Sequence, residues 1–376
     1  MTTPSKPLDG IIVVSLEQAV AAPMASRRLA DAGARVIKLE RPEGDFARGY
    51  DTVVLGQSSY FVWLNRGKES VRVDLTTAAD LALFDALLGR ADVFIQNLKP
   101  GALARLGYPH ETLRARYPKL IMCSISGYGE TGPNATRKAY DLLIQTEAGL
   151  ATVTGGPGEP SRVGVSIVDI TTGMTAYEAI LEALIGRGRT GEGADIRVSM
   201  FDTVTELMAV PLLHAAVGKP PKRIGLAHPS LAPYSVFGTR DHVPILISIQ
   251  NDREWVVFAR DVLKQPHLGH DARFATAVAR VTNRVETDAI VTACFAAHSA
   301  DDMIALLNAA DVAYGCVSDL DAVLAHPNLR QIDVTTPAGV VRVSAPPAQQ
   351  VGSPRTFGAM PALGAHDTSI RAEFLA

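Results

Sequence analysis

Gly10-Ile11-Ile12-Val13-Val14-Ser15-Leu16 is a nearly continuous apolar run bounded by polar residues, which is typical of a buried strand. A helix is expected next at Met24–Asp31, with Pro23 suited to its first turn and Gly33 to its end. Residues 34–40 have the pattern of a second strand. Such a strand–helix–strand unit normally forms a parallel, right-handed pair. The chain therefore opens with the beginning of a parallel α/β sheet.

The same alternation continues as far as residue 199. Further strands are expected at 70–75, 91–96, 120–125 and 194–199, and helices or helical fragments at 78–88, 103–106, 112–116 and 171–185. This order predicts an α/β fold, with an open, Rossmann-like parallel sheet that carries helices on both faces.

A different pattern follows the break at Gly218-Lys219-Pro220-Pro221, which ends a long apolar-periodic helix expected at 200–217. Beyond the break, the sequence indicates a strand at 244–249 and helices near 252–263, 285–296 and 301–310. We therefore predict a large α/β domain at 1–217, a small α+β domain at 218–333, and a return of the chain to the large domain at 334–376.

Composition narrows the class of protein. With 376 residues the chain is too long for one ordinary core, and its net charge of −3 disfavours nucleic acid or an anionic membrane as partner. Cys123, Cys294 and Cys316 are too far apart for a metal pair or a disulfide framework, which fits a reducing cytosol. The nine histidines have no metal-ligand spacing. Apolar runs are too short for a membrane span or a signal peptide, so we expect a soluble cytoplasmic protein without a metal.

Several catalytic motifs are absent from the sequence. Glu17–Pro23, after the first strand, contains no Gly-x-Gly-x-x-Gly fingerprint, and the chain has neither a Walker loop nor a Gly-x-Ser-x-Gly elbow. Dinucleotide dehydrogenases, nucleoside triphosphatases and α/β-hydrolases are therefore disfavoured. The small residues Ala19, Ala21 and Ala22 would still let a ligand approach the backbone before a helix. A plain tight turn explains them equally well.

The ends of the expected strands carry loops and charges of interest. Ser126–Gly129 follows a strand at the edge where open α/β sheets bind ligands. Arg41, Arg105 and Lys138 follow strands or loops and could together hold phosphates. Taken singly, each of these cations also fits a solvated surface position.

Asp169 is the most informative single residue. It lies at the end of the apolar run 163–170, just before a stretch of helical period at 174–184. A carboxylate at the positive end of a helix should stay ionised and could attack an electrophile. Aspartate is also a preferred N-cap, and capping would explain the position without chemistry. The local pattern alone leaves both interpretations open.

Taken together, motifs along nearly the whole chain resemble the family III CoA-transferases, which include formyl-CoA transferase and the carnitine and bile-acid CoA-transferases. The matching segments are Leu8–Ile11, Ala32–Pro42, Gly44-Asp45, Asn65–Ser70, Ala91–Val93 with Asn97, Pro100-Gly101, Arg105–Gly107, Ser126–Gly129, Lys138–Asp141, Thr154-Gly155, Val168-Asp169 with Gly173, Arg189–Gly193, Ala325–Pro327 and Pro361–His366.

This resemblance implies a mechanism and a set of site residues. The aspartate that matches Asp169 is the family's nucleophile: it forms a mixed anhydride with the acyl group, then an aspartyl-CoA thioester that the acceptor acid captures. Coenzyme A is thus a substrate, no metal is needed, and the partners are an acyl-CoA, a small carboxylic acid and a second copy of the chain in an interlocked homodimer. The implied CoA-binding residues are Val20, Ala21, Arg41, Val73, Asn97, Leu98, Arg105, Leu106, Lys138, Tyr140 and Met200.

Two departures from the family narrow the reaction. Formyl-CoA transferase has a glutamine where this chain has Val20, and a glycine-rich lid that is not found here, so formyl or oxalyl transfer is not expected. The related α-methylacyl-CoA racemases place a histidine where this chain has Tyr140, which is a poor general base at neutral pH. Racemase therefore ranks below transferase. A CoA-binding protein without turnover is a third alternative, which the retained Asp169 disfavours.

The substrate branch rests on three further stretches. Arg41–Arg48, Phe61–Arg66 and Ile249–Trp255 resemble the branch that uses succinyl-CoA with short dicarboxylates such as itaconate, mesaconate, citramalate or malate. An arginine could hold the distal carboxylate by a bidentate pair. The candidates for this contact are Arg28, Arg48 and Arg66.

Overall fold

A parallel sheet occupies the centre of the first compact unit in the computed structural model, which describes residues 6–349, 351 and 355–376. Its strands lie in the order β3-β2-β1-β4-β5-β6. This is the strand order of the dinucleotide-binding α/β folds, with a reversal between β1 and β4. The strands are β1 (Ile12–Leu16), β2 (Arg35–Glu40), β3 (Lys68–Arg72), β4 (Val93–Gln96), β5 (Ile121–Ser126) and β6 (Asp195–Ser199).

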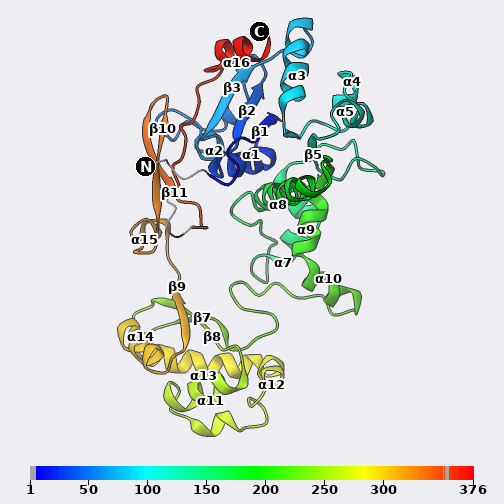
Figure 1. Cartoon of the computed structure of the whole chain (residues 1–376). Coiled ribbons are helices and arrows are strands. Elements are labelled where there is room, and N and C mark those ends of the chain that lie inside the picture. The colour runs from blue at the N-terminus through cyan, green and yellow to red at the C-terminus, as the bar shows by residue number, and fades with distance from the viewer. Residues whose placement is uncertain (1–5, 350, 352–354) are drawn as a thin grey trace. The chain divides into compact units, whose positions relative to one another are not determined.

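Helices cover both faces of this sheet, as the sequence predicts (Figure 1). On one face α1 (Ala21–Asp31) and α8 (Ile167–Thr190) bury Leu29, Ala176 and Ile180 against the strands. On the other face α3 (Ala78–Arg90), α5 (His110–Arg116) and the C-terminal helix α16 (Asp367–Phe374) bury Phe84 and Phe374. Alternate residues of one strand, such as Val13 and Val14, therefore serve two cores, which explains the continuous apolar runs.

The remaining elements of this unit are short. They are η1 (Phe46–Gly49), α2 (Ser59–Leu64), α4 (Ala102–Arg105), α6 (Asp141–Glu147), α9 (Met200–Leu207) and the antiparallel pair β10 (Gln331–Thr336) and β11 (Gly339–Ser344). The C-terminal segment lies beside β3, where Gly67 N donates to Ala359 O at 2.8 Å and His366 N donates to Ser70 O at 3.0 Å.

The second compact unit has its own antiparallel sheet, of β7 (Tyr234–Gly238), β8 (Pro244–Ser248) and β9 (Ala313–Cys316), in that order. Its core, around the buried Trp255, Phe258 and Phe295, is built from β7, β8 and the helices α11 (Asp252–Asp261), η2 (Pro266–Gly269), α13 (Arg284–Ala297) and α14 (Ala300–Ala309). The unit also contains α12 (Ala277–Thr282) and α15 (Leu320–Leu324).

The units divide the chain as Met1–Leu150, Arg162–Val210 and Arg330–Ala376 for the first, and Ala151–Ser161 and Pro211–Leu329 for the second. Our predicted boundaries fall after residues 217 and 333. The prediction does not include the segment 151–161, which belongs to the second unit in the structure. Helices α7 (Leu150–Val153) and α10 (Ala209–Ala216) span two of the divisions. The parts of the predicted segments that cover residues 1–5, 350 and 352–354 lie outside the described residues.

Two expected helices differ from the structure. The helix expected at 200–217 is broken into α9 and α10, because Pro211 has no N–H to donate to the carbonyl of Leu207. The helix expected at 171–185 begins earlier, at Ile167, and extends to Thr190, where Gly191 ends it with a φ of 76°. Asp169 therefore lies inside the first helical turn and not before it.

One membrane-related observation concerns helix length. Within the described part of the chain, no single helix is long and apolar enough to span a bilayer, although the bent pair α13 and α14 passes the same test of length and composition together.

Candidate functional site

The carboxyl ends of β1 and β4 mark the point where the strand order of the large sheet reverses. Open α/β sheets bind their ligands at such a switch point. Two cavities open there. One, which we call the strand-end cavity, measures about 340 Å³ and lies at the ends of β1, β2 and β3. The other, the aspartate cavity, measures about 580 Å³ and is lined by residues that follow β1, β4 and β5. Gln18 and Leu98 line both.

Asn97 joins the two loops at this switch point. Its Oδ1 accepts a hydrogen bond from Gln18 N at 3.0 Å, and its Nδ2 donates to Gln18 O at 2.8 Å. The amide thus satisfies both backbone groups of a residue in the loop after β1. Its main role in this structure is to hold the shape of that loop.

A buried ion pair supports the next residue of the same loop. Ala19 has a left-handed φ of 64°, which is strained for any residue with a Cβ. Its N–H donates to Asp45 Oδ1 at 3.1 Å, and Asp45 Oδ2 lies 2.8 Å from Nζ of the fully buried Lys38. Burial lowers the pKa of Lys38, but Glu17, Asp45 and Glu40 outweigh it and raise the pKa above its ordinary value. The charged lysine therefore keeps Asp45 in place under the strained turn.

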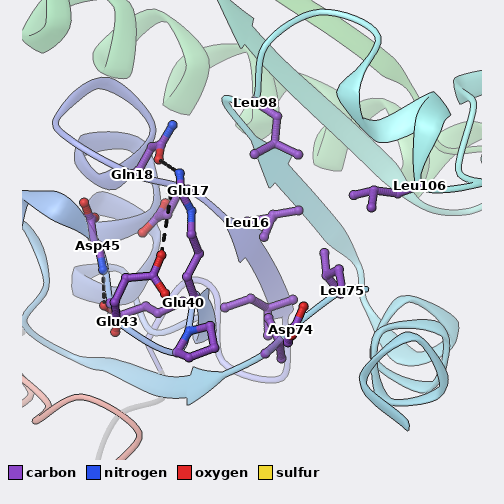
Figure 2. Close-up of a pocket in the computed structure, with 15 residues that line it drawn as sticks. Leu16, Glu17, Gln18, Glu40, Glu43, Asp45, Asp74, Leu75, Leu98 and Leu106 are labelled. Carbon is purple, nitrogen blue, oxygen red and sulfur yellow. Dashed lines mark hydrogen bonds and ion pairs between the residues drawn. The ribbon is translucent and has the colours of Figure 1, made fainter. Parts of the chain in front are cut away.

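The strand-end cavity is an apolar slot with a polar mouth. Figure 2 shows Leu16, Leu75, Leu98 and Leu106 directed toward the same space from separate segments. Leu39, Pro42 and Val73 complete its apolar lining, and the polar lining residues are Glu17, Gln18, Glu40, Arg41, Glu43, Asp45 and Asp74. At the mouth, Arg41 Nη2 donates to Gln18 Oε1 at 2.7 Å. An apolar slot with a cation at its entrance suits a flat, weakly polar ring attached to a phosphate.

Asp169 faces the aspartate cavity from the first turn of α8. The N-cap position belongs to Ser166, whose side chain makes no capping hydrogen bond. Asp141, at the start of α6, caps the helix instead: its Oδ2 accepts from Val168 N at 2.8 Å and from Asp169 N at 3.1 Å. Within the described residues the carboxylate of Asp169 itself makes no hydrogen bond, so capping does not explain it.

The acidity of Asp169 differs from our expectation. Burial, and then the charge of Asp141, raises the pKa of Asp169 from its ordinary 3.8 to about 7. The expectation that the helix end keeps this carboxyl fully ionised is therefore wrong. A partly buried carboxyl of this basicity, which lines a cavity at a switch point, has the properties of a functional group.

Comparison with known proteins now decides the family. The model of CoA-transferase family III matches residues 8–367. The chain belongs to this family. Acetyl-CoA:oxalate CoA-transferase of Acetobacter aceti is 36% identical, with 100% of this chain and 98% of the relative covered. Succinate–glutarate CoA-transferase of Agrobacterium fabrum is 34% identical over 98% of this chain and 95% of the relative. The crystal structure of an Asp-to-Ala mutant of Rv3272 from Mycobacterium tuberculosis superposes with a TM-score of 0.88, at 32% identity and full coverage of both chains.

Most CoA-binding residues expected for this family III CoA-transferase line one of the two cavities. Those in the strand-end cavity are Arg41, Val73, Leu98 and Leu106. Those in the aspartate cavity, besides Leu98 again, are Val20, Ala21, Asn97, Lys138, Tyr140 and Met200. Arg105 is exposed on α4, one residue before Leu106. The cavities thus bring together residues that follow each of the six strands of the large sheet.

The three arginines expected to hold a distal carboxylate have other partners in this CoA-transferase. Arg66 is buried and donates to Asp31 at 2.9 and 2.6 Å, and Arg48 pairs with Glu40 at 2.8 Å. The guanidinium of Arg28 stacks on a tyrosine ring at 5.6 Å. None of these three arginines is among the described residues that line the two cavities. We therefore withdraw them as candidates.

Sequence reasoning missed an aromatic wall of the aspartate cavity. Tyr50 and Tyr60 line it, with ring centroids 5.5 Å apart, and Tyr60 Oη lies 3.4 Å from Ser166 Oγ. Burial, followed by the charge of Asp169, raises the pKa of Tyr50 to about 12. Tyr50 is therefore a neutral hydroxyl at every physiological pH. Both tyrosines follow Gly44-Asp45 in the sequence, Tyr50 at the end of η1 and Tyr60 in the first turn of α2.

Over residues 6–349, 351 and 355–376, the enzyme has no group of three or more His, Cys, Asp or Glu side chains that could hold a metal ion.

The raised pKa makes Asp169 a source of pH-dependent instability in this enzyme. Between about pH 4 and about pH 7 the folded protein retains a proton on Asp169 that the unfolded chain has lost. The free energy of unfolding therefore includes a favourable contribution from Asp169 that is full below about pH 4 and is lost as the pH rises through about 7. Asp169→Asn should therefore raise Tm relative to wild type more at about pH 8 than at about pH 5.

Thermal unfolding at both pH values measures this difference. Asp202→Asn is a matched control, because Asp202 is also the third residue of a helix, α9, but is exposed. A Tm difference for Asp169→Asn that does not depend on pH would contradict the assigned acidity.

Proposed function

We propose that this enzyme transfers CoA from an acyl-CoA donor, such as succinyl-CoA, to a short dicarboxylic acid, with Asp169 as the nucleophile. The observation that carries the proposal is the carboxyl of Asp169. It lines a cavity at the switch point, its backbone is held by Asp141, and its own oxygens make no hydrogen bond within the described residues. A carboxylate whose oxygens are not occupied by hydrogen bonds within the protein is available to attack a thioester.

The two cavities together suit an extended CoA molecule. We place the adenine in the strand-end cavity between Val73, Leu98 and Leu106, with its phosphates near Arg41 and the exposed Arg105. The pantetheine arm then passes Gln18 and Leu98, which line both cavities. In the aspartate cavity Val20, Ala21, Asn97, Lys138, Tyr140 and Met200 are the proposed contacts along the path to Asp169.

The proposed reaction exchanges one activated carbonyl for another. The carboxylate of Asp169 attacks the thioester carbon of the donor, the C–S bond breaks, and a mixed anhydride and CoA thiolate form. The thiolate attacks the Asp169 carbonyl, which releases the donor acid and leaves an aspartyl-CoA thioester. The acceptor carboxylate then attacks this thioester, and the returning thiolate takes the acceptor acyl group and regenerates Asp169. Every step must exclude water, which would hydrolyse the intermediates.

The names of relatives support the substrate class. They include succinate–glutarate, succinyl-CoA:mesaconate and acetyl-CoA:oxalate CoA-transferases. All three names include a diacid, and these diacids differ in chain length, so the preferred chain length is a property to be measured for this enzyme. Our expectation against oxalyl transfer is tested by including oxalate as an acceptor.

We further propose that the enzyme is a homodimer, with the two chains interlocked as the family resemblance implies. Helix α10 supports a second copy: it has no buried residue, and Val210, Leu212 and Leu213 are exposed on it. A largely apolar helix that is exposed in one copy normally packs against another chain. Light scattering measures the mass directly, and a monomer at all concentrations would contradict the dimer.

A cytoplasmic location stays a prediction from the sequence.

The activity itself is tested with purified enzyme, succinyl-CoA and a panel of acids, with mass spectrometry of the acyl-CoA products. We expect a new acyl-CoA and an equal amount of free succinate without ATP. Hydrolysis alone, or no exchange, would contradict the proposal. Exchange of an α-hydrogen for deuterium without transfer would support a racemase instead. CoA binding without either reaction would support a non-catalytic role.

Asp141→Asn should shift the pH dependence of this activity. The nucleophile must be deprotonated, so the rate falls below the pKa of Asp169, and the negative charge of Asp141 helps to raise that pKa. An amide can still accept from Val168 N and Asp169 N, but it removes the repulsion. We expect the acid limb of kcat/KM to move to lower pH, while burial keeps the pKa of Asp169 above 3.8. A rate profile measured from acid to neutral pH that is unchanged would contradict this coupling.

A further inference from the structure

The aspartate cavity must accommodate more negative charge than Asp169 alone. Asp141 and Asp169 already contribute two carboxyl groups to its lining. A dicarboxylate that reacts at one end brings its second carboxylate into the same partly enclosed space. Without a cation nearby, repulsion among these groups would oppose binding.

Four basic side chains line the cavity among the described residues: Lys99, Arg137, Lys138 and Arg162. Arg137 is already neutralised, because its two terminal nitrogens donate to Glu147 at 2.7 and 2.9 Å and its guanidinium stacks on the ring of Tyr128 at 4.9 Å. Lys138 is among the proposed CoA contacts. Lys99 offers a point charge without the planar fork that matches a carboxylate.

Arg162 is the cation with unused donors. Its Nη2 donates to Gly164 O at 2.9 Å, and within the described chain it forms no ion pair. A guanidinium has five N–H groups, so most of its donors are free for a ligand. Its exposed side chain lines the cavity, and its backbone belongs to the segment that leads directly into α8 and Asp169.

The base of this arginine is fixed. Val163 N, the next backbone group, donates to Gln145 Oε1 at 2.9 Å, and Gln145 Nε2 donates to Asp141 Oδ1 at 2.5 Å. Asp141 in turn holds the backbone of Asp169 at 3.1 Å. One hydrogen-bonded chain thus positions the backbone beside Arg162 and the backbone of Asp169 relative to each other.

We propose that Arg162 binds the distal carboxylate of the dicarboxylate substrate through a bidentate pair, while the reacting carboxyl group meets Asp169. This inference rests on the proposed CoA transfer and adds the residue that selects diacids over monoacids. Asp169 performs the same chemistry on either kind of acid, so only the distal contact distinguishes them.

The test compares two acceptors of equal length, glutarate and valerate, which differ only in the distal carboxylate. With succinyl-CoA as common donor, the ratio of kcat/KM for glutarate to that for valerate cancels any effect on the donor. We expect Arg162→Gln to lower this ratio about 10- to 100-fold, mainly through KM for glutarate. Arg162→Lys keeps the charge and should recover part of the loss. Arg189→Gln, at the exposed C-terminal end of α8, is the charge-matched control and should leave the ratio unchanged.

The outcomes separate this inference from the proposed function. A wild-type enzyme that transfers CoA to glutarate and valerate equally well overturns the role of Arg162 and keeps the transferase. An unchanged ratio in a folded Arg162→Gln, or equal losses for both acids, does the same. A wild-type enzyme that transfers CoA to no acid overturns both proposals.

Discussion

Asp169→Asn is expected to lower the rate of CoA transfer by a factor of about 1,000 or more, because an amide cannot form the anhydride and thioester intermediates. The substitution preserves the size of the side chain and leaves the backbone N–H that donates to Asp141. Folding and CoA binding should therefore persist. Steady-state transfer from succinyl-CoA and calorimetric binding of CoA measure the two properties separately.

Asp202→Asn provides the matched control for this experiment. Asp202 has the same place in the first turn of α9 that Asp169 has in α8, but it is exposed. Its amide should change stability by no more than a few tenths of a kcal/mol and leave transfer unaffected. If Asp169→Asn retained near-native transfer, or if both variants lost it equally, the nucleophile assignment would be wrong.

Gly173→Ala is the second substitution with a large expected effect. Helices α1 and α8 approach so closely at Gly173 that an added Cβ would lie 2.6 Å from Met24 Cβ and closer still to the backbone oxygen of Ala21. The carbonyl of Ala21 is fixed in the first turn of α1, so α1 must move. We expect the free energy of unfolding to fall by about 3 kcal/mol, as for other overpacked cores.

The same substitution should weaken CoA binding. Val20 and Ala21, which line the aspartate cavity, stand at the start of the helix that Gly173→Ala displaces. Chemical denaturation and the Kd for CoA measure both consequences. Binding that is unchanged in a strongly destabilised variant would mean that the loop does not contribute to the CoA site.

Gly186→Ala is the control within the same helix. A Cβ at Gly186 meets no atom within 4 Å, so only helix propensity changes. Alanine there should raise the free energy of unfolding by up to about 1 kcal/mol. If both glycine variants destabilised the protein equally, close packing against α1 would not be the reason for Gly173.

Most strands of the central sheet could be predicted because the signal for each one lies within its own short segment of sequence. Strands buried on both faces are nearly continuous apolar runs, and β1, β2, β4 and β5 lie where the sequence places them. Strands with exposed residues gave no such signal: β9 has four exposed residues, and β11 alternates between partly buried and exposed positions. The strand order, and hence the switch point, depends on pairings between distant segments and could not be read from any one of them.

The site was predictable in its composition but not in its electrostatics. Of the eleven CoA-binding residues that the family resemblance implies, ten line the two cavities, yet the resemblance could not place the charge of Asp141 beside Asp169, 28 positions along the chain. The same holds for the arginines. Arg66 looks free in the sequence, but Asp31 binds it from α1, whereas Arg162 has no carboxylate partner in the described chain. Ion pairing depends on the tertiary structure, which is why the sequence could not exclude Arg48 and Arg66 as candidates.

The claim on which this account depends is that the carboxyl of Asp169 becomes acylated during turnover. Hydroxylamine added to the enzyme during turnover with succinyl-CoA should convert it to a hydroxamate, which peptide mass spectrometry locates. We predict the label on Asp169 alone, dependent on acyl-CoA and absent from Asp169→Asn. Active turnover without a label at Asp169, or with the label on another residue, would contradict the account.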